Sequence, residues 1–442
     1  MKYIISGAKP LSGTVRVSGA KNASLKLIIA ALLTKGESII HNVPRIRDII
    51  SLLEIINYLG GEDTFIDKNT VRVENKLNKF RIPLEIAGKT RVSILLIAPL
   101  LYTFGQAILP NPGGCRLGER SVDRLIDSLV QMGATIKYDS NDGYYYATLK
   151  ETKQAKIIFK KKSHTGTELA LMFASKINKK IKIVNAALEP EIDDLIAFLN
   201  KAGAMVKRQG SDIDVQGNLN LKGSTITIQS DRIEAATFII LSCLYQGSIV
   251  VENVNLAGLE PFLVYFKKAG FKFQFDLNRG LFKVLPNANI LPTNIVTAPH
   301  PGFLTDWQPL WTILMTQANG KSTMHETVFE NRLGYIKDLI KFGAKIKFFQ
   351  PEVENPEELY QFNGYDKNKH KHQAIEINGP TPFHNAYATM TDIRAGACLV
   401  IAALLAKGKS VIAGAEQIER GYEDLPSKLI NIGASLEIDK EE

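Results

Sequence analysis

Apolar and polar residues follow the same order six times along the 442-residue chain. Each repeat begins with an almost wholly apolar helix, continues through a short strand and a polar loop, and ends with an amphipathic helix, a glycine and another strand. The amphipathic helices bury one face, because their apolar side chains return at helical spacing. The other helices are apolar on every side and are predicted to lie inside a core. They cover residues 25–33, 94–101, 169–174, 235–244, 310–315 and 395–405.

A glycine follows each amphipathic helix at the point where the chain turns into a strand. Many helices end at a residue in the left-handed conformation, which glycine adopts without strain. The repeats are about 70 residues long, which exceeds the period of common solenoids and indicates a copied globular unit. The predicted class is therefore mixed α/β, with helices enclosed by sheet. The six glycines are Gly60, Gly133, Gly203, Gly270, Gly343 and Gly433.

The length predicts two domains of three repeats each, because single cores stop growing near ~250–300 residues. The boundary is predicted within residues 219–231, where the chain is polar. Residues 1–19 precede the first repeat, and their pattern indicates two short strands that cross to the second domain. Two domains joined by two connections can hinge over a ligand, so the cleft between them is the predicted site.

Composition narrows the class of protein further. No apolar stretch approaches ~20 residues and no signal-peptide core is present, so we expect a soluble, cytoplasmic protein that does not span a membrane. The formal charge of +9 is attributed mostly to surface lysines. Residues 350–373 form the longest irregular stretch and are predicted to be a polar surface insertion. Its His370 and His372 lack the carboxylate or cysteine partners expected of a metal site.

Polar residues recur where the apolar helices begin. Helix N-termini carry partial positive charge, so six of them facing one cleft would suit phosphates and carboxylates. Capping alone explains a serine, threonine or aspartate there, and Thr305 with Gln308 fits a capping box. Capping does not explain cations, which are disfavoured at this end of a helix and therefore indicate an anionic ligand. The polar residues are Lys21, Asn22, Arg91, Ser163, Thr165, Asp231, Arg232, Thr305, Asp306, Asp392 and Arg394.

The chain has three cysteines, and one of them lies in a glycine-rich loop. Pro112, three glycines and two nearby arginines surround Cys115. Arg116 and Arg120 would lower the pKa of the thiol, which favours a reactive cysteine. Cys243 and Cys398 lie on apolar helices, so we expect inert buried thiols there.

Seven ordered motifs resemble the enolpyruvyl transferase family, in the branch whose acceptor is a UDP-sugar. The resemblance runs from Met1 to about Ile438. It implies a fold of two inside-out α/β barrels, one formed by residues 21–231 and the other by residues 1–20 with 232–442. The motifs are Ser18–Ala23, Pro112–Asp123, Asp231–Ala235, Pro301–Asp306, Phe329–Arg332, Asp392–Ala395 and Arg420–Glu423.

The resemblance implies a reaction and a role for each matching residue. The enolpyruvyl group of phosphoenolpyruvate would pass to the 3′-hydroxyl of UDP-N-acetylglucosamine through a tetrahedral intermediate with release of phosphate, which commits bacteria to peptidoglycan synthesis. Cys115 matches the acid that protonates the methylene carbon and is alkylated by fosfomycin. Asp306 matches the base, and Lys21, Arg120 and Arg420 match the groups that hold phosphoenolpyruvate. The substrate-binding residues implied are Asn22, Arg91, Arg120, Asp123, Ser163, Asp231, Arg332, Asp392 and Arg394.

Neither a metal nor an organic cofactor is expected, because the chain has no His-Glu-x-x-His, no Gly-x-x-x-x-Gly-Lys-Ser/Thr and no strand–Gly-x-Gly-x-x-Gly–helix motif. One departure from the family pattern is His164-Thr165, where many members have Val-Gly in a segment that contacts uridine. The sister enzyme that uses shikimate 3-phosphate is the nearest alternative, although it has Lys-Ser in place of Lys21-Asn22 and lacks the cysteine loop. A retired paralogue is a further alternative.

A ring-shaped DNA clamp, also built from six α/β units, is a non-enzymatic alternative. Helices that line a DNA pore carry lysine and arginine at helical spacing. The apolar helices of this chain have no such rows, and the amphipathic ones mix charges, as in Arg124 and Asp127. The sequence therefore does not favour binding of nucleic acid.

Overall fold

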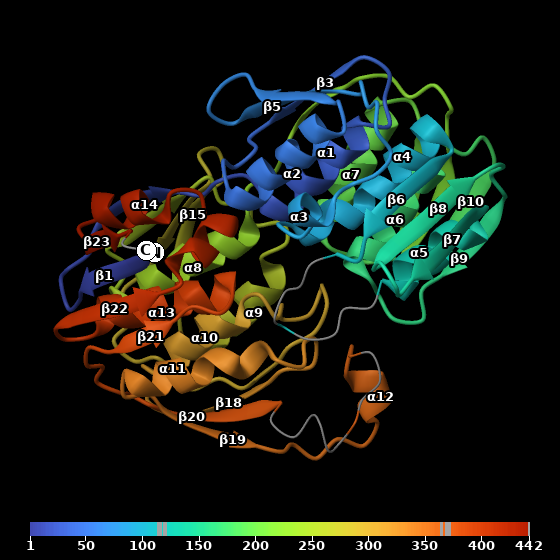
Figure 1. Ribbon diagram of the computed structural model, residues 1–442. Helices are drawn as coiled ribbons and strands as arrows, with labels where there is room; N and C mark the ends of the chain where they lie inside the picture. Colours follow the sequence, from blue (N-terminus) through green and yellow to red (C-terminus); the bar gives the residue numbers. More distant parts are fainter. Residues whose placement is uncertain (113–116, 118–121, 363–365, 367–372, 441–442) are drawn as a thin grey trace. The chain divides into compact units, whose positions relative to one another are not determined.

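The computed structural model describes residues 1–112, 117, 122–362, 366 and 373–440 (Figure 1). They form two compact units. The first unit contains residues 19–112 and 122–229, and the second contains residues 1–18 and those described from 230 to 440. Cys115, Arg116, Arg120, His370 and His372 lie outside the described residues.

The first unit holds three repeats, each built from a strand, a buried helix, a parallel strand, an amphipathic helix and an antiparallel hairpin. In the second repeat, a single parallel bridge from Arg81 to Ile108 takes the place of the first strand. The elements are α1 (Lys21–Ala31), β3 (Glu37–His41), α2 (Arg47–Tyr58), β4 (Glu62–Phe65), β5 (Thr70–Glu74), α3 (Leu84–Ala87), η1 (Arg91–Leu96), α4 (Ile97–Phe104), β6 (Gln106–Pro110), α5 (Asp123–Gln131), β7 (Ala134–Asp139), β8 (Tyr144–Leu149), β9 (Ala155–Ile158), α6 (His164–Ala174), β10 (Lys180–Val184), α7 (Pro190–Lys201), β11 (Met205–Gln209), β12 (Asp212–Gln216) and β13 (Thr225–Thr227).

The second unit repeats this plan, with residues 1–18 included in its sheets. Its elements are β1 (Lys2–Ser6), β2 (Gly13–Arg16), α8 (Arg232–Leu244), β14 (Ile249–Glu252), α9 (Glu260–Lys268), β15 (Phe273–Asp276), β16 (Leu281–Val284), β17 (Ile295–Val296), α10 (Gln308–Met315), β18 (Gly320–His325), η2 (Arg332–Tyr335), α11 (Ile336–Lys341), β19 (Lys345–Phe349), α12 (Pro356–Leu359), β20 (Ala374–Gly379), β21 (Tyr387–Thr389), α13 (Ile393–Leu405), β22 (Lys409–Ala413), η3 (Ala415–Arg420), α14 (Leu425–Asn431) and β23 (Ser435–Asp439).

Each unit is closed by a strand that is distant in sequence. In the first unit, β13 pairs in parallel with β3 of the first repeat and completes the sheet β13-β3-β5-β4. In the second unit, β1 lies between β22 and β23 and is antiparallel to both. The described N-terminal strands therefore belong to the sheets of the second unit, as β2 also pairs with β14.

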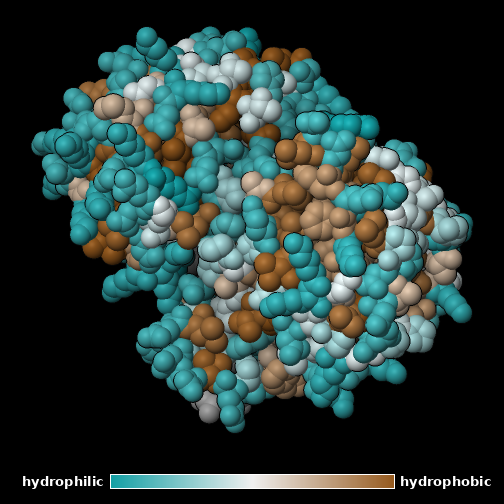
Figure 2. All heavy atoms as spheres, turned by 180° about the vertical axis from the view of Figure 1, so that it is seen from behind, coloured by the Kyte–Doolittle hydropathy of each residue, from teal (hydrophilic) through white to brown (hydrophobic). Residues whose placement is uncertain are grey.

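The apolar helices form the core of each unit, as predicted. Every residue of α8 from Arg232 to Cys243 is buried, and every residue of α1 except Asn22 is buried. Figure 1 shows these helices with sheet strands around them within each unit. Figure 2 shows one face of the molecule, where small hydrophobic patches interrupt a largely hydrophilic surface. Within the described ranges, no helix is long and apolar enough to cross a membrane.

The glycines after the amphipathic helices have the predicted conformation. Their φ angles lie between +90° at Gly60 and +111° at Gly133. The strands predicted after them are present, as in β7 and β19. The backbone therefore requires glycine at these turns, because other residues rarely adopt such angles.

Two local predictions were wrong. Thr305 does not cap a helix, because α10 begins only at Gln308 and the Thr305 hydroxyl instead donates to the Glu326 carboxylate over 3.0 Å. The insertion is not wholly on the surface, since Tyr360 and Phe362 are buried and their rings stack 4.8 Å apart. The polar composition of the insertion did not predict this burial, because only two aromatic residues hold the segment against the rest of the unit. The Tyr360 hydroxyl lies 2.9 Å from His325 Nε2.

Candidate active site

In the second unit, a buried arginine organises several of the predicted site residues. Arg332 opens η2, and its side chain is only 1% exposed. Its guanidinium donates to the Thr305 carbonyl from Nε and Nη2, to Asp306 Oδ1 over 2.8 Å and to Asp392 Oδ1 over 3.5 Å. A guanidinium presents several donors in a fixed plane, so these contacts hold three chain segments in one arrangement.

Asp306 is the most accessible member of this cluster, with its side chain 33% exposed. Besides its bond to Arg332, its Oδ1 lies 3.9 Å from Arg394 Nε. The preceding loop is held by aromatic packing, because Phe303 is buried within 5.5 Å of the Trp307 and Trp311 ring centroids. Gly302 is required in this loop, since a Cβ there would lie 2.5 Å from the Ala298 side chain. The fold thus presents a carboxylate on a rigid support with two cations beside it.

Burial and charged neighbours together shift the pKa values of the buried groups. Burial opposes the charge of Arg332, but Asp392, Asp306 and Glu326 outweigh it and raise the pKa of the guanidinium. The pKa of Arg394 is also raised, because Tyr422, Asp231 and Asp306 outweigh its burial. Burial raises the pKa of Glu326, although Arg332 acts in the opposite direction. Both arginines therefore stay cationic inside the unit.

Asp231 and Asp392 both act as helix caps. Asp231 accepts hydrogen bonds from two backbone N–H groups at the start of α8, and Asp392 does the same for α13. Each is almost fully buried, so capping accounts for their geometry. Arg420 ends η3, and its Nη1 donates to Gln417 over 3.4 Å.

In the first unit, the corresponding cation is Lys21 at the first position of α1. Its Nζ lies 2.7 Å from Asp48 Oδ2 in the first turn of α2, and both side chains are largely buried. Asn22 follows with a partly exposed side chain. One turn further along α1, Lys26 forms an ion pair with Glu168 over 3.2 Å.

The other predicted residues of this unit also lie at helix starts. Ser163 caps α6 by accepting from the Gly166 N–H over 3.1 Å, and Arg91 opens the 3₁₀ turn η1 ahead of α4. Asp123 is the first residue of α5 and is exposed. The predicted acid Cys115 and the predicted ligand Arg120 lie outside the described residues. Cys243 and Cys398 are buried, and burial raises the pKa of each thiol well above its ordinary value.

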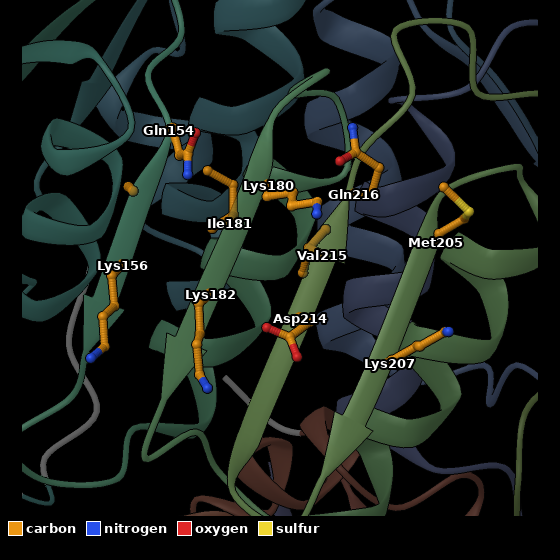
Figure 3. A pocket seen from close by; sticks show the side chains of 11 residues that line it. Gln154, Lys156, Lys180, Ile181, Lys182, Met205, Lys207, Asp214, Val215 and Gln216 are labelled. Atoms are coloured by element: carbon orange, nitrogen blue, oxygen red, sulfur yellow. The ribbon is translucent and has the colours of Figure 1, made fainter.

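A concave region lies elsewhere, on the exposed face of the sheet β9-β10-β12-β11 (Figure 3). Its volume is about 820 Å³, and it contains none of the predicted site residues. Lysines from three strands surround Asp214, so the face is basic but crossed by a carboxylate. Among the residues described, no group of three or more His, Cys, Asp or Glu side chains could hold a metal ion.

Comparison with known proteins shows the family of this chain. Residues 5–429 match the family described as EPSP synthase (3-phosphoshikimate 1-carboxyvinyltransferase). The chain belongs to this family of enolpyruvyl transferases. A protein of Campylobacter hominis is 36% identical over 437 residues, 98% of each chain, and one of Acidobacterium capsulatum is 35% identical over 98% of this chain and 95% of its own. Both are named UDP-N-acetylglucosamine 1-carboxyvinyltransferase.

Solved structures confirm the enolpyruvyl transferase fold. The enolpyruvyl transferase NikO from Streptomyces tendae superposes with a TM-score of 0.85 at 21% identity, over 99% of this chain and 98% of its own. EPSP synthase from Acinetobacter baumannii gives 0.73 at 16% identity, over 99% of this chain and all of its own. At such identities the likeness concerns the fold.

Several residues of this enolpyruvyl transferase escaped prediction. Asp48, Glu168 and Glu326 each pair with a site residue or its neighbour, and all three are buried. Glu168 directly precedes an apolar stretch, which was a usable signal, because a fully buried carboxylate needs a partner. Glu326 lies between His325 and Thr327 and gave no such signal. Asp48 gave no such signal, since an acidic residue in a first helical turn is ordinary.

Proposed function

We propose that this chain transfers the enolpyruvyl group of phosphoenolpyruvate to the 3′-hydroxyl of UDP-N-acetylglucosamine, with release of phosphate. The observation that carries the proposal is identity of 34–36% to relatives named UDP-N-acetylglucosamine 1-carboxyvinyltransferase, over 98–99% of this chain in the first four. Because phosphoenolpyruvate and UDP-N-acetylglucosamine are cytoplasmic metabolites, we place the reaction in the cytoplasm, at the first committed step of peptidoglycan synthesis.

The reaction needs an acid, a base and cations. Protonation of the methylene carbon of phosphoenolpyruvate leaves a cationic centre at C2, and the acceptor hydroxyl adds there as it loses its proton. Loss of a proton from the new methyl group and departure of phosphate then restore the double bond. Asp306 is the proposed base, since it is the accessible carboxylate of its cluster, and Cys115 is the proposed acid. No step requires a metal or organic cofactor.

The arginines divide into two roles. Arg332 is almost fully buried and already bonded to Asp306, Asp392 and the Thr305 carbonyl, so we propose that it positions the base rather than contacting a substrate. Lys21, Arg120 and Arg420 are the proposed ligands of phosphoenolpyruvate, with Arg91 and Arg394 adding positive charge near the anions. Asn22, Asp123 and Ser163 are the proposed contacts of the sugar nucleotide. Asp231 and Asp392 are proposed to fix the starts of α8 and α13 by capping these helices.

Shikimate 3-phosphate is the alternative acceptor, because the matching family description is that of EPSP synthase. The test measures phosphate release from phosphoenolpyruvate by the purified protein with each acceptor in turn. Release only with UDP-N-acetylglucosamine supports the proposal, whereas release only with shikimate 3-phosphate replaces it with the sister activity. Release with neither overturns both.

Fosfomycin tests the acid separately. The proposal expects one adduct on the peptide that carries Cys115, found by mass spectrometry of the digested protein. An adduct on Cys243 or Cys398 would contradict it, and those two buried thiols are the internal controls.

A further inference from the structure

A second charged cluster lies at the start of α6 and has no part in the reaction as proposed above. His164 opens this helix, and its Nε2 lies 3.0 Å from Glu168 Oε1 one turn later. Glu168 Oε2 lies 3.2 Å from Lys26 Nζ of α1. Glu168 is fully buried, so its two oxygens depend on these two cations. The cluster thereby connects α1 with α6, and both helices pack on α7.

The balance of charge in this cluster depends on the imidazole. Glu189, at the cap position of α7, adds a second buried carboxylate that acts on His164. Two cations face two carboxylates when His164 is charged, but only Lys26 remains when it is neutral. Burial opposes the charge, yet Glu168 and Glu189 outweigh it and raise the pKa of His164 above its ordinary value of 6.5. An uncompensated buried carboxylate is costly, so losing this proton strains the connection.

Both ends of the cluster adjoin residues already proposed to bind the sugar nucleotide. Ser163, directly before His164, caps α6, and Asn22 lies one turn before Lys26 on the same face of α1. Helix starts that must hold a ligand are sensitive to shifts of less than an ångström. The ion pairs of Glu168 with His164 and Lys26 thus link the two helices one turn from these two residues.

We propose that His164, in its charged form, is a positioning residue that holds the starts of α1 and α6 in the arrangement that binds UDP-N-acetylglucosamine. This inference rests on the proposed function. Because the charged form is lost as pH rises through the pKa of His164, KM for the sugar nucleotide rises over that interval while kcat changes less. The affinity is fully present at lower pH, where the imidazole keeps its proton.

The test compares steady-state kinetics of the wild type, His164→Gln and His164→Lys between about pH 6 and about pH 9, the range in which a histidine titrates. We expect KM for UDP-N-acetylglucosamine to rise about tenfold across this range in the wild type, because the ion pair between His164 and the buried Glu168 is lost. His164→Gln should show the raised KM at every pH. His164→Lys, which keeps the charge, should show the low KM throughout. His41→Gln is the matched control, because His41 lies at the end of β3 and its ring contacts the Thr70 hydroxyl.

Glu168→Gln gives an independent measurement if a lysine at 164 prevents folding. It removes the carboxylate that depends on His164, so KM should then no longer rise with pH. The inference is overturned if His164→Gln keeps the wild-type KM and profile, if His164→Lys behaves as His164→Gln does, or if Glu168→Gln retains the full pH dependence. A wild type that releases no phosphate with UDP-N-acetylglucosamine overturns the proposed function instead, so the two failures are distinguishable.

Discussion

The two units arrange their charges differently although they share one fold. In the second unit, Arg332 gathers Asp306, Asp392 and the Thr305 carbonyl around one buried guanidinium. In the first unit, each buried lysine has a carboxylate at salt-bridge distance, as Lys21 has Asp48 and Lys26 has Glu168. A guanidinium fork fixes directions, whereas an ammonium acts as a point charge on a flexible stem. The comparison indicates that the side chains around Arg332 are held in fixed directions, whereas the lysine pairs of the first unit leave more freedom to the charged group.

The largest effect is expected from removing the centre of the arginine cluster. Arg332→Met leaves Asp306 and Asp392 without their shared buried cation, so the free energy of unfolding should fall by about 3–5 kcal/mol. Activity should be lost as well, since the base is no longer held. Arg332→Lys keeps the positive charge but not the planar set of donors. Its free energy of unfolding and its activity should therefore lie between those of the wild type and those of Arg332→Met. Urea unfolding measures the change, and a loss below about 1 kcal/mol for the methionine variant would show that the cluster is not cooperative.

Replacing the proposed base tests chemistry more than stability. Asp306→Asn keeps the size of the side chain but cannot accept a proton, so kcat should fall by about 10²–10⁴-fold. Arg332 retains Asp392 and the Thr305 carbonyl, so the protein should stay folded. Steady-state phosphate release gives kcat, and thermal unfolding confirms the fold. Turnover close to that of the wild type would remove Asp306 from the mechanism.

Replacing Lys21 should have a smaller effect, seen mainly in the kinetics with phosphoenolpyruvate. Lys21→Met should lower kcat/KM for phosphoenolpyruvate by about 10- to 100-fold, the worth of one or two charged hydrogen bonds. Lys182→Met is the matched control, because Lys182 pairs with Asp212 over 3.3 Å on an exposed sheet face. Equal losses in the two variants would mean that general positive charge, and not the place of Lys21, is responsible.

The smallest effect is expected where an ion pair is exposed. Arg208 Nη1 lies 2.6 Å from Asp193, whose side chain is 62% exposed. Asp193→Asn should change the free energy of unfolding by less than about 1 kcal/mol, because water screens such pairs. It also serves as the matched control for Asp306→Asn. A larger loss of unfolding free energy would mean that burial does not explain the difference between this exposed ion pair and the buried pairs of Arg332.

Much of the fold could be predicted because its helices and turns depend on residues that are close together in the sequence. The wholly apolar helices and the glycines after the amphipathic ones depend only on neighbouring residues, and both are confirmed. The start of α10 could not be predicted from the capping pattern, because Thr305 bonds instead to Glu326, 21 residues away. The burial of Tyr360 and Phe362 in the insertion could not be predicted either, because it depends on contacts with a segment that is distant in sequence. Contacts between distant segments decided these cases.

The candidate site shows the same limit. Cations are disfavoured at the positively charged start of a helix, so lysine and arginine there indicated anionic ligands. This inference needs no knowledge of the fold. Which carboxylate meets each cation depends on tertiary packing, so the pairing of Lys21 with Asp48 could not be foreseen. It could not be foreseen either that Arg332 is almost fully buried, unlike an arginine that contacts a substrate, since exposure is a property of the folded chain.

The place of β1 between β22 and β23 has a consequence for synthesis on the ribosome. The first unit has all its strands once β13 at Thr225–Thr227 has emerged, so it can fold while translation continues. Strand β1 is made before every other strand of the second unit, yet both its neighbours lie after residue 408. During translation this strand therefore stays unpaired until β22 and β23 have also been made, and its sheet in the second unit closes only then.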